Sequence, residues 1–270
     1  MKNKTSKDNR KAFYFAAGLI LILLSIAVLA PVLSPNDPYK TNLAYAQVKS
    51  SEQFPLGTDA LGRCMLSRIL YGARISIFSS TAIILTVFSF GTIIGGVSAY
   101  FGGIIDTVLT KFITVMQAFP KIILALAIAG LLGIGIQYTI IALCLVEWTE
   151  YARLARSLTF GTRQHTYIKA ARVCGETHLA ILFRRIIPNI ISPLIVNASL
   201  GIASMIMEIA ALSYLGAGVK EPMAEWGAMM NTGRNYLQTD TRLVLIPGLA
   251  IFITAAIFNL FGEKLRDRLN

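Results

Sequence analysis

Long apolar stretches separated by short polar segments make up most of this chain of 270 residues. A helix needs about 20 mostly apolar residues to cross a bilayer. Six stretches meet or approach this length, and the third, which is short, can gain its first turns from the amphipathic segment before Pro120. They are residues 13–33, 75–101, 120–132, 136–148, 186–215 and 243–261. The pattern therefore predicts an all-α integral membrane fold with about six transmembrane helices.

The first apolar stretch follows a basic tail, residues 1–12. The stretch is longer than the apolar core of a typical signal peptide, and Pro31 stands directly after the one site that resembles a cleavage site. We therefore expect an uncleaved first helix at 13–33.

Composition supports the membrane class and indicates an orientation. Hydrophobic residues make up 55% of the chain and charged residues 14%, whereas soluble domains carry about a quarter charged residues. A net charge of +11 would favour nucleic-acid binding in a soluble chain, but in a membrane protein lysine and arginine collect in cytoplasmic loops. Most of the 25 basic residues fall in the N-terminal tail, the loop 153–185 and the C-terminal tail. We therefore predict cytoplasmic N- and C-termini, contact with membrane lipid and no nucleic-acid partner.

Four parts follow from these boundaries. Residues 1–12 form a cytoplasmic tail and 13–33 the first transmembrane helix. Residues 34–74 form an extracytoplasmic segment that ends in an interfacial helix, because "MLSRILYGARIS" carries apolar residues at helical spacing with arginines between them. Residues 75–270 form a five-helix core that contains the loop 153–185.

That loop is predicted to fold into helix, turn and helix. Residues 166–183 contain no proline, and small or apolar residues recur at helical spacing on both sides of Gly175. Gly175 is expected to allow a sharp turn where a Cβ atom would obstruct the chain. Two interpretations stay open on this pattern: a surface against which another protein packs, or a solvated loop that only orients the chain by its charge.

The loop sequence "YIKAARVCGETHLAILFRRIIPN" resembles the coupling-loop motif of binding-protein-dependent ABC transporter permeases. Five positions match that motif, whereas Lys169 stands where glutamate is usual and Arg185 where histidine is common. The matching positions are Ala170, Ala171, Gly175, Pro188 and Asn189.

Other motifs resemble the peptide/nickel branch of the same family, in the expected order from about residue 13 to the end. They are "LGTDALGRCMLSRILYGARISI", with Cys64 where aspartate is usual, "YFGGIIDTVLTKFITVMQAFP", "WTEYARLARS", "SYLGAGVKEPMAEWGAMM" and "FNLFGEKLRDRLN".

The resemblance implies a channel-forming subunit in a bacterial inner membrane. It would pair with a second homologous permease as a heterodimer, dock two cytoplasmic ABC ATPases and receive its solute from an extracytoplasmic binding protein. The residues implied at the ATPase contact are Tyr167, Lys169, Ala170, Ala171, Gly175, Arg185 and Pro188. The sequence contains no G-x-x-x-x-G-K-[ST] loop, so an ATPase would have to be another polypeptide, and no cofactor is expected.

Several acidic and small residues fall inside the apolar stretches. Glu208 lies in the fifth stretch, where a carboxylate costs about 2.5–3.5 kcal/mol and must face protein or water; it either lines the solute path or serves as a structural partner. Glu147 and Glu150 are expected at the inner interface of the fourth stretch. Gly91 and Gly95 form a small-x-x-x-small pair that favours close helix packing.

The solute is the least determined feature. Both histidines fall in the loop and the three cysteines are far apart, so no metal site is predicted. The chain length and the stretch "AEWGAMM" are more similar to permeases for nickel or a metal chelate, with di- or oligopeptides next. An ATP-independent secondary transporter or channel stays the alternative, whereas an enzyme is not expected, since H-E-x-x-H and G-x-S-x-G motifs are missing from the sequence.

Overall fold

The computed structural model describes the backbone of residues 2–269 and the side chains from Arg10 to Leu269. Within these residues the chain is helical, apart from loops and a single β-bridge between Thr58 and Cys64. The elements are α1 (Lys2–Leu33), η1 (Leu43–Tyr45), α2 (Met65–Phe101), α3 (Gly103–Gln117), α4 (Lys121–Leu132), α5 (Ile136–Thr162), α6 (Thr166–Val173), α7 (His178–Ile181), η2 (Leu182–Ile186), α8 (Ile187–Tyr214), α9 (Trp226–Gly233), η3 (Arg234–Tyr236) and α10 (Arg242–Leu269). The all-α prediction is confirmed.

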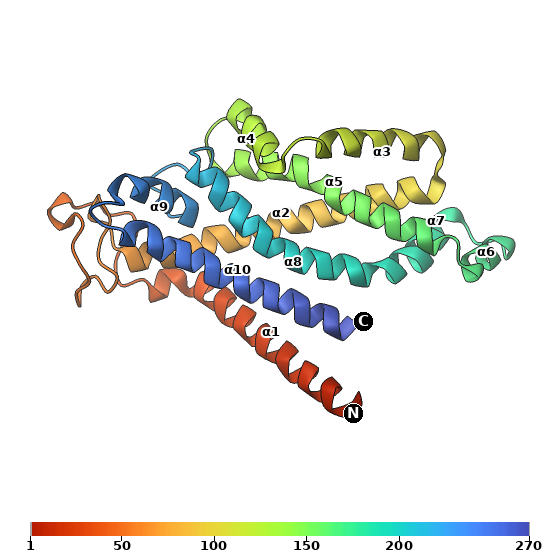
Figure 1. The fold of residues 1–270 in the computed structure, drawn as a ribbon, viewed down its shortest axis with the longest axis horizontal. Helices are drawn as coiled ribbons and strands as arrows, with labels where there is room; N and C mark the ends of the chain where they lie inside the picture. The colour runs from red at the N-terminus through yellow and green to blue at the C-terminus, as the bar shows by residue number, and fades with distance from the viewer. Residues whose placement is uncertain (1, 270) are drawn as a thin grey trace.

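Five long helices, α1, α2, α5, α8 and α10, run along the long axis of the molecule (Figure 1). The closest packing joins α2 to α5 and depends on the predicted glycine pair. A Cβ atom on Gly91 would lie 2.7 Å from the carbonyl oxygen of Trp148, and one on Gly95 would lie 2.1 Å from that of Ala152. Only glycine lets the two backbones approach this closely, so the predicted small-residue contact is confirmed.

Four described helices are long and apolar enough to cross a membrane: α1, α2, the helical run 178–214 that ends in α8, and α10. Helices α3 and α4 are together long and apolar enough for a fifth crossing, although they meet at a bend of 90°. The remaining candidate, α5, is long enough, but it carries charged residues from its middle toward its C-terminal end. The predicted total of six spans is therefore not confirmed by length and composition.

The segment before the second span differs from its prediction. Residues 65–74 form the first turns of α2, which continues without a break to Phe101. Arg68 is buried in these turns (2% exposed), so this helix packs into the protein instead of lying on a lipid surface. The helical spacing of apolar residues correctly predicted a helix here, but the buried face of this helix contacts other protein segments.

The two ends of the bundle carry different structures (Figure 1). The loop that contains residues 34–64 lies at one end together with α9. The helices α6 and α7 lie at the other end, where α1 begins and α10 ends. The predicted grouping of both chain ends with the loop 153–185 therefore agrees with the arrangement of the helices.

Residues 34–64 form a cap that is joined to the loop before α9 by buried charges. Arg63 is 2% exposed; its Nε lies 2.6 Å from Oδ2 of Asp59 and its Nη2 donates to Oε1 of Glu221 at 3.0 Å. Arg68 adds hydrogen bonds to the carbonyl oxygens of Pro38 and Pro222, at 3.1 and 3.2 Å. Two segments far apart in the sequence are thus held together at this end of the bundle.

Candidate functional site

The loop between α5 and α8 has the helix, turn and helix that its sequence predicts. The chain leaves α6 in a Schellman-type turn, in which the amide of Glu176 donates to the carbonyl of Ala171 and the amide of Gly175 donates to that of Arg172. Gly175 adopts the left-handed conformation (φ +81°) that this turn requires. Thr177 then caps α7, because its side chain accepts a hydrogen bond from the amide of Ala180.

Gly175 is needed for its backbone conformation and not for lack of space. The expectation that a Cβ atom would obstruct the chain there is wrong, since no atom lies within 4 Å of the place a Cβ would take. An L-residue in the left-handed region costs about 1–2 kcal/mol, which is sufficient reason for glycine at this position.

Helix α6 has one face in the protein and one face in solvent. Ile168 and Ala171 are buried (0% and 6% exposed) and pack in a core cluster with Tyr100, Ala155 and others from α2 and α5. Three of the predicted contact residues on the same helix, Tyr167, Lys169 and Ala170, are exposed, and so is Val173. The helix is therefore fixed to the bundle by its inner face while its outer face stays open.

The remaining predicted residues lie next to this open face. Arg185 forms a double hydrogen bond with the carboxylate of Glu176, one of 3.0 Å from Nε and a second from Nη2. Asn189 donates to the hydroxyl of Tyr167 at 3.0 Å. Pro188 is exposed in the first turn of α8. The hydrogen bond and the charge of Arg185 lower the pKa of the Glu176 carboxyl below its usual value.

Two contacts that the sequence did not reveal connect the loop to α2. The hydroxyl of Tyr100 and Nδ1 of His178 share a hydrogen bond of 2.9 Å, and the guanidinium of Arg172 lies 5.2 Å from the centre of the Tyr100 ring. Tyr100 is separated from both by a long stretch of sequence, so no local pattern indicates these pairs. They attach the loop to the end of α2.

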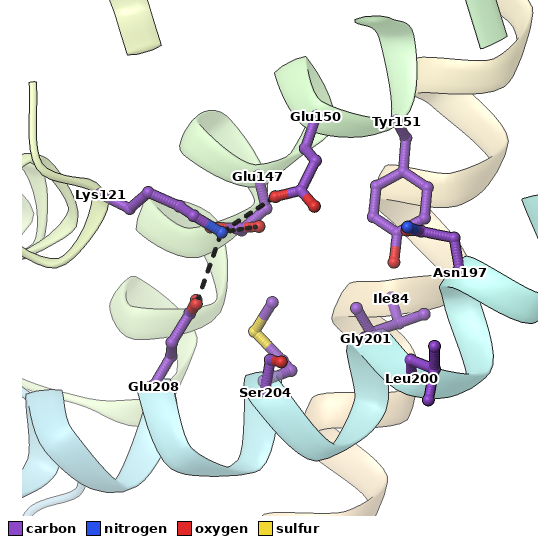
Figure 2. A pocket seen from close by; sticks show the side chains of 11 residues that line it. Ile84, Lys121, Glu147, Glu150, Tyr151, Asn197, Leu200, Gly201, Ser204 and Glu208 are labelled. Atoms are coloured by element: carbon purple, nitrogen blue, oxygen red, sulfur yellow. Dashed lines mark hydrogen bonds and ion pairs between the residues drawn. The ribbon is translucent and has the colours of Figure 1, made fainter. Parts of the chain in front are cut away.

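A second polar site lies inside the bundle, around Glu208 (Figure 2). The ammonium of Lys121, at the start of α4, lies 3.1 Å from Oε1 of Glu147, 3.0 Å from Oε2 of Glu150 and 3.7 Å from Oε1 of Glu208. Helices α4, α5 and α8 each contribute to this ion cluster. The prediction that Glu208 faces protein or water is confirmed, since its side chain is 14% exposed and points into the cluster.

Glu147 lies farther from the end of its helix than the apolar stretch indicated. Helix α5 does not end near Trp148 but continues to Thr162, so Glu147 lies in the middle third of the helix. Its side chain is 6% exposed, whereas that of Glu150 is 50% exposed. The apolar run on which the expectation rested is shorter than the helix that contains it.

Two cavities adjoin the ion cluster. One, of about 120 Å³, is lined by the four charged residues and by side chains of α2, α5 and α8, including Tyr151, Asn197 and Ser204. The other, of about 330 Å³, lies toward the end of α3 and shares Lys121, Glu147 and Glu150 with the first. Lys121, Glu147 and Glu150 therefore line both spaces. The described residues contain no group of three histidine, cysteine or acidic side chains placed to hold a metal ion.

Three kinds of comparison with known proteins agree. A family model described as "Binding-protein-dependent transport system inner membrane component" matches residues 89–270. The dipeptide transport system permease protein DppC of Haemophilus influenzae is 37% identical over 98% of this chain and 91% of that protein. The nickel transport system permease protein NikC of Escherichia coli is 37% identical over 97% of this chain and 95% of that protein.

A solved structure, that of the MetNI methionine ABC transporter in inward-facing conformations, shares the fold. Its matching chain has a TM-score of 0.58 and 19% identity, over 76% of this chain and 98% of that chain. At this identity the likeness bears on the arrangement of the helices alone.

The apolar helices, the exposed loop and the internal polar site define a membrane transport subunit. The chain belongs to the family of binding-protein-dependent transport system inner membrane components. It is an integral membrane permease of an ABC importer and not an enzyme, and permeases of this family work with ATPase subunits and a binding protein. Since ABC importers are driven by ATP, the ATP-independent alternative is set aside.

Proposed function

We propose that this chain forms one half of the channel of an ATP-driven importer for a small peptide. The second half is a homologous but different permease, so that the channel is a heterodimer. Two ATPases dock on the loop 153–185, and an extracytoplasmic binding protein delivers the solute to the end formed by residues 34–74. Both chain ends lie in the cytoplasm of the bacterial cell, on the side of the ATPases.

The observation that carries the docking proposal is the two-faced helix α6. Its inner face is buried against the bundle, so a force on its outer face reaches α2 and α5 without a flexible link. The outer face presents Tyr167, Lys169 and Ala170 at the end of the molecule where α1 begins and α10 ends. Val173 of the same helix adds an apolar side chain that is 90% exposed.

The orientation follows from charge. Basic residues gather in the loop that contains α6 and in the two tails, and the helices place these three parts at one end of the bundle. Cytoplasmic segments carry this excess of lysine and arginine, so we assign that end to the cytoplasm. The cap at the opposite end then faces the binding protein.

Coupling uses the connections of α6. When the ATPases close on ATP, they move α6 as a rigid body together with α7, and the movement reaches α8 through η2. Helix α8 carries Glu208 next to the internal cavities, so the movement changes access to them. Alternating access requires an element with two positions of this kind, and Glu208 lines the path of the solute in this scheme.

A small peptide is preferred over nickel as the solute. The names of similar permeases include dipeptide and nickel transport. Nickel is held by imidazole and sulfur ligands in addition to oxygen, yet the cavities beside Glu208 are lined by no histidine and no cysteine. A metal chelate, whose metal is already covered, stays the second candidate.

Co-purification tests the docking proposal. We would express the chain with its partner permease and ATPases and compare Ala170→Glu with the wild type. Ala170 is exposed whereas Ala171 is buried, so Ala170→Glu alters the docking face and leaves the packing intact. The matched control is Ala46→Glu, which places the same charge on an exposed position of the cap.

We expect Ala170→Glu to lose the ATPases and keep the partner permease, and Ala46→Glu to keep both. Retention of the ATPases by Ala170→Glu at the wild-type level would overturn the docking site.

A further inference from the structure

We propose that the cavity beside Glu208 binds the ammonium group of the solute, so that this subunit selects solutes with a free amine. The inference deepens the proposed function, since it names the chemical feature by which the path recognises a peptide. It rests on the ion cluster of α4, α5 and α8 and on the space next to it (Figure 2).

The first argument is that the cluster already holds an ammonium. Lys121 Nζ donates to Oε2 of Glu147 at 3.2 Å and to Oε2 of Glu150 at 3.0 Å, and lies 3.7 Å from Oε1 of Glu208. Carboxylates on three sides form the environment that a primary ammonium with three donors requires. The side chain that supplies it is itself half-exposed (49%), so it has room to move aside.

The second argument is that the cluster has unused capacity. Three carboxyl groups face one lysine, so the carboxyl groups outnumber the resident cation. Oε2 of Glu208 is buried and makes no hydrogen bond, whereas both oxygens of Glu147, whose side chain is 6% exposed, have only the ammonium of Lys121 beside them, at 3.1 and 3.2 Å. Buried carboxylate oxygens without a partner cost free energy. A second cation with N–H donors supplies the missing hydrogen bond.

The third argument is that the adjoining space is polar and has the right size. A water molecule needs about 10–15 Å³ of such a cavity, so about 120 Å³ holds several waters or a small amine. Ser204 and Asn197 line it, and the hydroxyl of Tyr151 points into it. Gly201 makes this hydroxyl position possible, because a Cβ there would lie 2.4 Å from it. These groups suit the amide that follows a peptide amine.

The chemistry favours an amine over a divalent metal ion. The charged lining consists of three carboxylates and a lysine, and no three acidic, histidine or cysteine side chains among the described residues are placed to hold a metal ion. The α-amino group of a peptide has an ordinary pKa of about 7.7–8.0 and is mostly protonated at neutral pH. It carries the same three donors as the side chain of Lys121.

Ligand binding to the purified chain tests the inference without partners. The probe is ethylammonium chloride, with sodium chloride at the same concentration as the reference, and the readout is the thermal unfolding midpoint in detergent. We expect ethylammonium to raise the midpoint by about 3 °C at tenfold above its Kd. The rise should vanish in Glu208→Gln and persist in Glu263→Gln, which removes a carboxylate from an exposed position of α10.

Lys121→Met should change the ethylammonium shift in the opposite direction to Glu208→Gln. An increased shift cannot result from a variant that fails to fold, so this variant is a control for loss of folding in Glu208→Gln. Removal of the resident ammonium vacates its place, so the ethylammonium shift should grow. A purely structural cluster would not bind the probe more tightly after losing its lysine. The inference is overturned if the wild type shows no shift beyond that of sodium chloride, if Glu208→Gln keeps the full shift, or if Lys121→Met shows no increase.

Uptake by the reconstituted importer relates the site to transport. In vesicles with all subunits and the binding protein, Glu208→Gln should lower the uptake of dialanine about tenfold or more, as loss of one charged hydrogen bond predicts, while Glu263→Gln keeps the wild-type uptake. Wild-type uptake by Glu208→Gln would overturn the inference and leave the proposed function standing. Absence of ATP-dependent uptake in the wild type would overturn the proposed function, whereas the binding measurements above would still decide on the amine site.

Discussion

The cap and the coupling loop each contain an arginine bound to carboxylates, in very different surroundings. Arg63 in the cap is 2% exposed and joins Asp59 to Glu221. Arg185 in the loop is 44% exposed and binds Glu176 alone. The same chemistry is therefore buried at one end of the molecule and open to solvent at the other.

The difference indicates that the two ends have different tasks. Burial raises the pKa of Glu221, but the hydrogen bond and charge of Arg63 outweigh it and lower the pKa overall. A buried pair is costly to break because each partner is left as an unpaired charge. An exposed pair is screened and contributes little. The buried arginine thus ties the cap to a distant loop, whereas the surface of the loop 153–185 is open, as the proposed docking of a partner requires.

Loss of Arg63 should have the largest effect. Arg63→Met leaves the buried Asp59 with only the more distant Arg68, whose Nε lies 3.5 Å from its Oδ2, so we expect the free energy of unfolding to fall by about 3 kcal/mol and the melting temperature by roughly 10 °C. The fluorescence of Trp226 reports the change, since its indole donates to the carbonyl of Ile69 next to the cap. Arg185→Met is the matched control and should leave the melting temperature unchanged. Equal decreases in melting temperature for the two substitutions would contradict the difference in burial between the two ends of the molecule.

A moderate effect is expected at the turn of the loop. Gly175→Ala forces an L-residue into φ +81° and should cost about 1–2 kcal/mol, measured by denaturant unfolding in detergent. The matched control is Gly161→Ala in α5, a helical and exposed glycine with no atom within 4 Å of a Cβ. That substitution should stabilise the helix by about 0.5–1 kcal/mol. A neutral Gly175→Ala would show that the turn is not formed in solution.

The smallest effect is expected for the exposed pair itself. Glu176→Gln should not change global stability but should speed hydrogen exchange of the amides in residues 174–185. The pKa of Glu176 is lowered in the folded chain, so the contribution of the pair is complete above the ordinary carboxyl pKa. It is lost as the pH falls through the lowered value. In the wild type, exchange corrected for its intrinsic pH dependence should rise only at acidic pH; a rise near neutrality would contradict this assignment.

Most of the fold could be predicted because transmembrane helices have a strong local signal. The apolar stretches 13–33, 186–215 and 243–261 fall on α1, α8 and α10. The helix, turn and helix of the loop followed from spacing around one glycine. The 90° bend between α3 and α4 did not, because apolar composition on both sides of Pro120 gives length but no direction.

The ion cluster could not be predicted from local sequence. Lys121, Glu147 and Glu208 stand on three helices, and each alone resembles an interfacial charge or an isolated buried one. The Arg63 network has the same character, since Glu221 joins it from a distant loop. Only the packing of the helices brings these groups within 4 Å of one another, the distance of an ion pair.

The sequence by itself determined the class of protein, the helices and the form of the coupling loop, because hydrophobicity, helical spacing and backbone conformation act between near neighbours. The tertiary structure alone decided which face of α6 is open, which charges are buried at the cap and which meet around Lys121. Burial and electrostatic partners depend on distances between helices, and glycine contacts such as that of Gly95 with Ala152 set those distances.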